Sequence, residues 1–446
     1  MSERPGGADE RARVGVLGLW HLGSVTAACL AEGGFDVVGL DPDPEVVAEL
    51  AAGRPPVAEP GLAELIAADV EAGRLRFATP DADSLAGLGV LWVAFDTPVD
   101  EEDRVDTEFV VNHVRDVLPK LDRGALVVTS SQLPVGTVGR FEAMAAEAGR
   151  EDLEFGAVPE NLRLGKALDS FRAAERFVAG VRSDAGHEAL APLLEPFGES
   201  IEWMGVESAE MTKHALNGFL ATSVAYINEI ATISEAVGAD AAEVSRGLKS
   251  DVRIGPRAYL GPGDAFAGGT LARDITTLRR VAAENNLPDH LVAGVAASND
   301  AHRRWARRVL SDFLGAEGGL AGKRVGVWGL AYKPGTDTLR RSSALELCRW
   351  LREQGAEVSA HDPAVASLPE ADAAAGIEMA DSALAAAADA DALVVSTAWP
   401  EYREVAAAEI LGAMRGSLII DAAGHLAGTV GADPAAAYVR VGVRPR

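Results

Sequence analysis

The sequence predicts an α/β fold with two doubly wound domains joined by a central helical domain. Residues 12–41 follow the pattern strand, turn, helix, strand, and a similar pattern begins at about residue 322. Between these segments, from about residue 205, long helical stretches have few turn signals. A chain of 446 residues is long enough for about three domains. We expect them over residues 1–204, 205–315 and 316–446.

The first of these segments is predicted to be a nucleotide-binding βαβ unit. "RVGVLGL" (13–19) starts as a strand, "SVTAACLAEGG" (24–34) is helical, and "FDVVGLD" (35–41) is a second strand that ends in Asp41. In such units a glycine turn brings the pyrophosphate to a helix N-terminus, and an acid after the second strand binds the ribose hydroxyls. Asp41 fits that role and favours NAD over NADP. Because a similar pattern begins at about residue 322, both outer domains are predicted to be Rossmann-like.

The glycine turn departs from the G-x-G-x-x-G pattern in one position. Gly18 and Gly23 occupy the first and third glycine positions, and Trp20 occupies the second. The pattern leaves open how closely the backbone can approach a pyrophosphate there. The predicted cofactor-binding residues of this unit are Gly18, Trp20, His21, Leu22, Gly23 and Asp41.

Two further strands end in short polar turns. "VLWVAFDTP" ends at Thr97 and Pro98, and "ALVVTSSQLPVGT" turns at Ser131 and Gln132. Open parallel sheets bind their ligands at the carboxyl ends of the strands. We expect Thr97, Ser131 and Gln132 to lie near the cofactor.

The composition excludes several classes of protein. With 48% hydrophobic and 24% charged residues the chain is neither disordered nor fibrous, and no apolar run reaches the roughly 18 residues of a membrane span. A net charge of −26 disfavours nucleic acid and anionic membranes as partners. The opening segment has no apolar core of a signal peptide, and we expect a cytoplasmic protein. Two cysteines, Cys29 and Cys348, provide neither a disulfide framework nor a metal-ligand spacing.

The helical middle carries a polar pair in apolar surroundings. Lys213 and Asn217 are four residues apart and so share one helix face. Their neighbours include Leu216 and Phe219, which indicates that the segment is not freely exposed. A partly buried lysine beside an amide suits an oxyanion stabiliser or a proton donor. The later βαβ pattern ends in Asp362, as the first ends in Asp41.

The order of motifs resembles the UDP-glucose/GDP-mannose dehydrogenase family. The resemblance spans nearly the whole chain and rests on "VAEPGLAEL" (57–65), "DTPVDEEDRVD" (96–106), "SQLPVGT" (131–137), "PENLRLGKA" (159–167), "KHALN" (213–217), "RIGP" (253–256), "GPGDAFAGGTLARD" (261–274), "GLAYKPGTDTLR" (329–340) and "STAWPEY" (396–402). Members of this family oxidise the C6 alcohol of a nucleotide sugar to a carboxylate with two NAD molecules. The resemblance therefore implies NAD as cofactor and a UDP- or GDP-linked sugar as substrate.

The resemblance also assigns residues. It implies catalytic roles for Glu160, Lys213, Asn217, Thr270 and Asp274. It implies cofactor contacts for Arg273 and Arg340, besides those named above, and substrate contacts for Leu162, Arg163, Lys213, Asn217, Arg253, Phe266, Gly268 and Lys333. Arg253 matches an arginine that reaches the substrate across a subunit interface, which implies a homodimer.

Three positions depart from the family pattern. The family's glycine loop holds a cysteine that captures the aldehyde intermediate, and here Thr270 takes its place. A threonine hydroxyl is far less acidic than a thiol and needs an adjacent base. Gln132 replaces a threonine, and Leu164 replaces a glutamate tied to water and proton handling. These replacements indicate that the chain lacks the groups with which the family captures the aldehyde and hydrolyses the thioester.

These departures leave three hypotheses. The chain is an NAD-dependent oxidoreductase of nucleotide sugars that lacks the covalent thioester step, and so stops at the aldehyde or makes a redox-neutral change. Alternatively, it performs the full four-electron oxidation with Thr270 as an unusual nucleophile or through an aldehyde hydrate. The third hypothesis is a catalytically silent homologue that binds a nucleotide sugar, which Trp20 in the phosphate turn favours.

Overall fold

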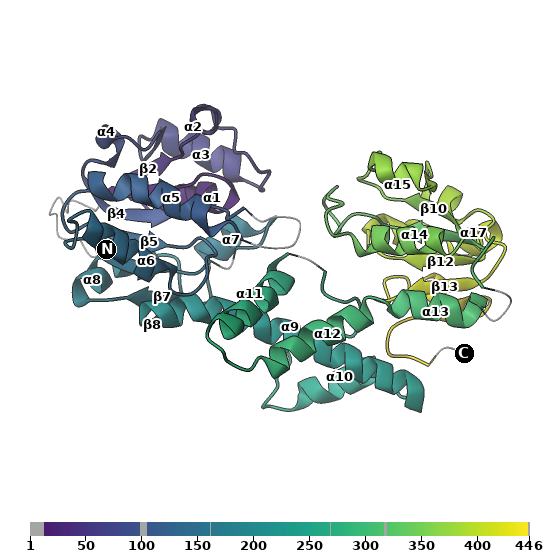
Figure 1. Cartoon of the computed structure of the whole chain (residues 1–446). Coiled ribbons are helices and arrows are strands. Elements are labelled where there is room, and N and C mark those ends of the chain that lie inside the picture. Colours follow the sequence, from purple (N-terminus) through teal and green to yellow (C-terminus); the bar gives the residue numbers. More distant parts are fainter. Residues whose placement is uncertain (1–12, 99–104, 161, 268, 316–318, 445–446) are drawn as a thin grey trace, which may run out of the picture. The chain divides into compact units, whose positions relative to one another are not determined.

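The computed structural model describes residues 13–98, 105–160, 162–267, 269–315 and 319–444 (Figure 1). The chain forms two compact units, one up to Leu216 and one from Asn217 onward. The division into three domains at residues 204/205 and 315/316 stays a prediction.

The first unit is built on an eight-stranded sheet in the order β3-β2-β1-β4-β5-β6-β7-β8. All neighbouring strands pair in parallel except β6 and β7. The strands are β1 Arg13–Leu17, β2 Val37–Leu40, β3 Leu75–Ala78, β4 Leu88–Val93, β5 Leu126–Thr129, β6 Glu154–Ala157, β7 Phe177–Val181 and β8 Ile201–Met204.

Helices cover both faces of this sheet, because its central strands are apolar on both sides (Figure 1). Residues of β1 and β4 therefore divide between two hydrophobic clusters, one containing α1 side chains and the other α5 and α6 side chains. The helices are α1 His21–Glu32, α2 Pro44–Ala51, α3 Leu62–Glu71, α4 Ala82–Leu85, α5 Thr107–Val117, η1 Leu118–Lys120, α6 Thr137–Glu147, α7 Ala167–Arg172 and α8 Asp184–Leu194.

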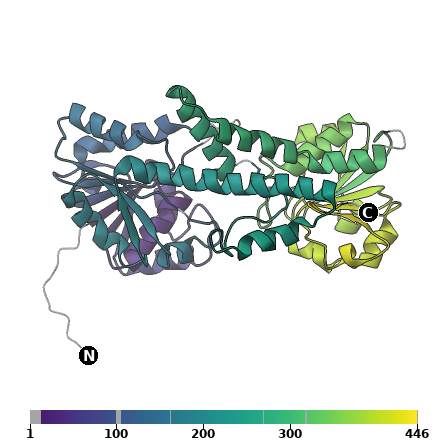
Figure 2. The same cartoon turned by 90° about the horizontal axis from the view of Figure 1, so that it is seen from below.

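A helical region follows the first sheet, as the sequence predicts. Its first member, α9, is one continuous helix of 32 residues that begins in the first unit and ends in the second (Figure 2). Phe266, Ile275 of α11 and Val295 of α12 belong to a small apolar cluster of their own. The helices are α9 Val206–Val237, α10 Ala241–Ser250, α11 Thr270–Glu284, α12 His290–His302 and α13 Trp305–Leu314.

The second unit contains a six-stranded parallel sheet in the order β11-β10-β9-β12-β13-β14. Two apolar clusters flank it, as in the first sheet. Its elements are β9 Arg324–Trp328, α14 Ser343–Glu353, β10 Glu357–His361, α15 Glu370–Ala374, β11 Ile377–Met379, α16 Ala383–Ala387, β12 Ala392–Val395, η3 Pro400–Glu404, α17 Ala407–Ala413, β13 Leu418–Asp421, η4 Val430–Ala432 and β14 Ala437–Val439. The predicted fold class, two Rossmann-like sheets joined by a helical region, is confirmed.

Within the described part of the chain, no helix combines the length and the apolar character that a membrane crossing needs.

Candidate functional site

The glycine turn after β1 brings the start of α1 against the sheet. Gly18 has a φ of +92°, and a Cβ there would lie 2.5 Å from the Phe95 ring. A Cβ on Gly23 would lie 1.7 Å from the carbonyl oxygen of Gly18. Only glycine therefore allows this approach of helix and turn. Trp20 has a φ of −76°, which any residue adopts, and its side chain is 50% exposed, so the turn accommodates it.

Asp41 lies at the end of β2, beside the glycine turn. Its carboxylate accepts the backbone N–H of Leu19 at 2.8 Å and that of Asp43 at 3.0 Å. A carboxylate has about four acceptor positions, so capacity remains for the hydroxyls of a ribose. The glycine turn and Asp41 fit a bound dinucleotide.

The ends of β4 and β5 add polar groups to the same edge of the sheet. Thr97 Oγ1 donates to the carbonyl oxygen of Gln132 at 3.1 Å, which joins two of the predicted cofactor residues. The hydroxyl of Ser131 is buried and makes no hydrogen bond to the described residues. A buried hydroxyl without a protein partner suits a position that a ligand or a water completes.

Glu59 is a structural anchor of this edge that the sequence analysis did not single out. Its buried carboxylate contacts His21 Nε2 at 3.0 Å and accepts the backbone N–H groups of Gly165 and Ala167, both at 2.8 Å. It thereby ties the start of α1 to the loop before α7. Glu59 stands in "VAEPGLAEL", a motif that could have signalled it.

Lys213 and Glu160 are brought together in the first unit. Lys213 Nζ donates to the carbonyl oxygen of Glu160 at 2.6 Å and lies 3.8 Å from its carboxylate. Glu160 also accepts the N–H of Leu162 at 2.6 Å. Both residues line a small cavity of about 20 Å³ together with Ser131 and Gln132. His214 is buried there and contacts the Leu133 carbonyl at 3.0 Å, a structural role.

Asn217 and Asp274 are brought together in the second unit. Asp274 is fully buried in α11, and its carboxylate accepts a hydrogen bond from the Asn217 side-chain amide. Thr270 is the first residue of α11, and its side chain is exposed. Within its own unit, no described carboxylate or imidazole is hydrogen-bonded to the Thr270 hydroxyl. Gly268, a predicted substrate contact, lies outside the described residues.

The remaining predicted residues lie on the surfaces of their units. Arg253 is paired with Asp251 of its own loop at 2.7 Å, which together with a second hydrogen bond raises the pKa of the guanidinium. Phe266 exchanges two backbone hydrogen bonds with the Asn299 side chain. Three of them are exposed: Arg163, Lys333 and Arg340. Leu162 is half-buried and packs against the hydrophobic cluster that contains the α1 side chains, and Arg273 is half-buried on α11.

Neither cysteine offers a thiolate. Cys29 in α1 and Cys348 in α14 are both fully buried in hydrophobic clusters. Burial raises the pKa of each thiol to about 12. Because the thiolate is the nucleophile, both side chains are inert near neutral pH.

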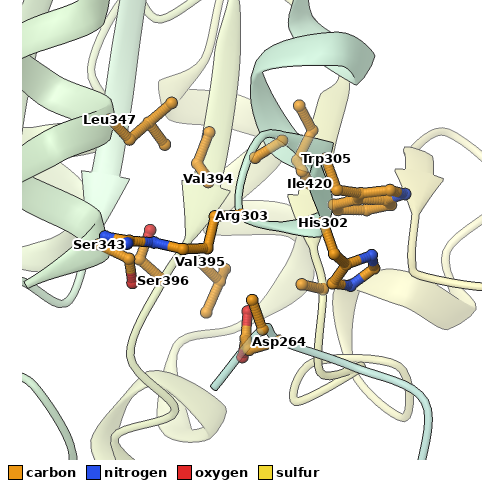
Figure 3. A pocket seen from close by; sticks show the side chains of 13 residues that line it. Asp264, His302, Arg303, Trp305, Ser343, Leu347, Val394, Val395, Ser396 and Ile420 are labelled. Carbon is orange, nitrogen blue, oxygen red and sulfur yellow. The ribbon is translucent and has the colours of Figure 1, made fainter. Parts of the chain in front are cut away.

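A pocket of about 60 Å³ lies at the carboxyl ends of β12 and β13 (Figure 3). Asp264, His302 and Arg303 give it a polar lining, and none of them was predicted from the sequence. Desolvation, with a contribution from Asp421, raises the pKa of Asp264 to about 7, and burial lowers the pKa of His302. The volume suits a few water molecules rather than a nucleotide.

The first sheet and its glycine turn define a dinucleotide-binding domain of the Rossmann type. The chain belongs to the UDP-glucose/GDP-mannose dehydrogenase family: residues 12–198 match its NAD binding domain, 207–301 its central domain and 326–427 its UDP binding domain. It is an NAD-dependent oxidoreductase of the nucleotide sugar dehydrogenase class, which acts on a CH–OH group.

Individual relatives are similar to this chain over most of their length. The chain is 35% identical over 422 residues to a UDP-glucose 6-dehydrogenase of Pseudomonas aeruginosa, and the match covers 92% of each chain. A solved UDP-glucose dehydrogenase of Pyrobaculum islandicum has a TM-score of 0.81 and 32% identity, covering 94% of this chain and 96% of its own. A UDP-D-ManNAc dehydrogenase of Pyrococcus horikoshii has a TM-score of 0.82 and 26% identity, covering 96% and 99%.

Proposed function

We propose that this enzyme oxidises the C6 alcohol of a UDP- or GDP-hexose by hydride transfer and does not use a covalent thioester. It then releases an aldehyde or returns the hydride in a redox-neutral change. The observation that carries this proposal is the state of the sulfur groups: the chain has two cysteines, and both are fully buried with the pKa of each thiol raised to about 12. No thiolate is available to capture the aldehyde.

Thr270 does not replace the missing thiolate in this proposal. A hydroxyl becomes a useful nucleophile only beside a general base, and no described residue of its own unit provides one. Leu164, which is 50% exposed, can neither activate water nor carry a proton. We assign Thr270 to orienting the substrate.

The groups needed for the first oxidation are present. NAD, when bound, accepts the hydride from C6. Lys213, held beside Glu160, would stabilise the developing alkoxide as a cation, or would accept the hydroxyl proton if it enters the reaction as the neutral amine. Asp274, with Asn217 hydrogen-bonded to it, would hold or pass on that proton, in our assignment through a water.

Full four-electron oxidation is the second candidate, because two of the relatives named above, which match nearly the whole chain, are UDP-glucose dehydrogenases of Pseudomonas aeruginosa and Pyrobaculum islandicum. NADH absorbance and product mass distinguish the two when the enzyme is incubated with NAD and a panel of UDP- and GDP-sugars. We expect one NADH or none per sugar, with an aldehyde or an isomerised sugar. Two NADH and a carboxylate from the unaltered enzyme would contradict the proposal.

A gain-of-function variant tests whether the missing thiol and acid are the reason that the carboxylate is not formed. Combining Thr270→Cys with Leu164→Glu restores the thiol and the carboxylate, two of the three groups that depart from the family pattern, and should produce the carboxylate product with two NADH per sugar. The matched control combines Thr270→Ser with Leu164→Glu, which supplies the acid without the thiol and should leave the product unchanged.

We propose further that the enzyme is a homodimer. An apolar row on α9 supports this: Phe219, Tyr226, Ile233 and Val237 are 69%, 48%, 57% and 73% exposed. Tyr226 and Ile233 also line a groove of about 590 Å³ in the second unit. A second copy that covers this face would remove the row from water. Sedimentation velocity at micromolar concentration measures the assembly, and a monomer mass would contradict the proposal.

A further inference from the structure

The N-terminus of α1 is the expected position of the NAD pyrophosphate. The first amides of a helix have no partner within the helix, and the helix dipole favours an anion there. The N-cap residue of α1, Trp20, makes no side-chain hydrogen bond to these amides. The close approach of Gly23 to Gly18 fixes this helix start at the edge of the sheet.

A carboxylate of the chain already contacts this position. Asp96 follows β4, which pairs directly with β1. Its Oδ2 accepts the backbone N–H of Leu22, in the first turn of α1, at 3.0 Å. The residue is exposed at this edge of the sheet, although protein atoms surround its carboxylate closely enough to desolvate it.

We propose that Asp96 acts as an internal anion that competes with the pyrophosphate of NAD for the N-terminus of α1, so that NAD binds together with one proton that neutralises this carboxylate. Asp96 is then an affinity-determining residue of the cofactor site. A protonated Asp96 would no longer repel the phosphates and could donate its O–H to one of their oxygens.

The described groups around Asp96 agree with this proposal. Desolvation raises the pKa of Asp96, and the charge of Glu160 raises it further, whereas the Leu22 amide and His21 lower it. His21 is paired with Glu59 at 3.0 Å, and Glu160 lies 3.8 Å from Lys213. The pyrophosphate would add negative charge beside Asp96 and raise its pKa again in the complex.

The direction of the pH dependence follows from this shift. A group whose pKa is higher in the complex takes up a proton on binding, so NAD affinity increases as the pH falls through the pKa of the complex. The increase is at most about tenfold per pH unit and ends below the pKa of the free enzyme. Above the pKa of the complex the affinity is low and constant.

Calorimetric titration of the full-length enzyme with NAD, from about pH 4.5 to about pH 9, tests the proposal. For the unaltered enzyme we expect the dissociation constant to rise with pH, and the binding heat to depend on the ionisation enthalpy of the buffer as proton uptake requires. Asp96→Asn keeps the shape but removes the charge. It should bind NAD about tenfold more tightly at the alkaline end, with a dissociation constant independent of pH.

Two matched variants separate Asp96 from its neighbours. Asp81→Asn removes a carboxylate that accepts the Ser84 amide at the N-terminus of α4, and it should leave both NAD affinity and its pH dependence unchanged. His21→Gln should retain the pH dependence. The proposal is overturned if Asp96→Asn and the unaltered enzyme bind NAD equally at every pH, or if the dependence persists in Asp96→Asn and disappears in His21→Gln. Absence of NAD binding by both at every pH would also overturn it.

Discussion

The two βαβ units of this chain look alike in sequence but differ in what their acidic residue does. Each has a glycine with positive φ after its first strand, Gly18 at +92° and Gly329 at +88°, and each second strand is followed by an aspartate. Asp41 accepts two backbone N–H groups in the described structure. Asp362 accepts five donors: the N–H groups of Leu330, Ala331, Ala364 and Val365 and the indole N–H of Trp399. Its carboxylate is saturated and structural.

The starts of the following helices differ in the same sense. α1 begins at His21, shortly after β1 ends at Leu17, and its first turn has no N-cap side chain. α14 begins only at Ser343, although β9 ends at Trp328, and the Ser342 hydroxyl caps it through the Leu345 amide at 3.0 Å. Of the two helix starts, only that of α1 lacks a cap from its own N-cap residue, since Asp96 accepts the Leu22 amide instead, and only this start lies beside an acid, Asp41, that has spare acceptor capacity. A shared topology therefore does not imply a shared ligand.

The largest effect that separates the two units is expected from Asp362→Asn. Three donors converge on Oδ2 and two on Oδ1, so either orientation of an amide places its NH₂ group against N–H donors. We expect a loss of about 3 kcal/mol or more in the free energy of unfolding. Urea denaturation followed by hydrogen–deuterium exchange measures this and locates the loss. A near-native stability would refute the structural role.

Asp41→Asn is the matched change in the first unit, and its main effect should fall on the cofactor. An amide there loses the charge that orients the ribose hydroxyls, and NAD affinity should decrease about 10- to 100-fold. The stability loss should be smaller than for Asp362→Asn, because fewer donors are left facing an NH₂ group. Calorimetry with NAD gives the affinity. Unchanged binding would remove Asp41 from the cofactor site and erase the contrast with Asp362.

The sequence predicted the fold because its signals are local. Strand and helix periodicities and the glycine turns are set within about a dozen residues, and they define both sheets. The difference between Asp41 and Asp362 was not predictable, because three of the five donors to Asp362 are distant in sequence: Leu330 and Ala331 lie 32 and 31 residues before it, and Trp399 lies 37 residues after it. The Asp96–Leu22 contact joins residues 74 apart and was missed for the same reason.

Ser342→Ala should have the smallest effect and tests the helix start of the second unit. The Ser342 hydroxyl accepts the Leu345 amide and donates to the Leu330 carbonyl at 2.6 Å, so alanine leaves two backbone groups without this partner. We expect a loss of about 1 to 2 kcal/mol in the free energy of unfolding, which is typical of a lost N-cap. NAD affinity should not change, because α14 belongs to the unit whose acid is already saturated. A weaker affinity for NAD in this variant, at full occupancy of the folded state, would mean that the two helix starts are not as separate in function as their caps indicate.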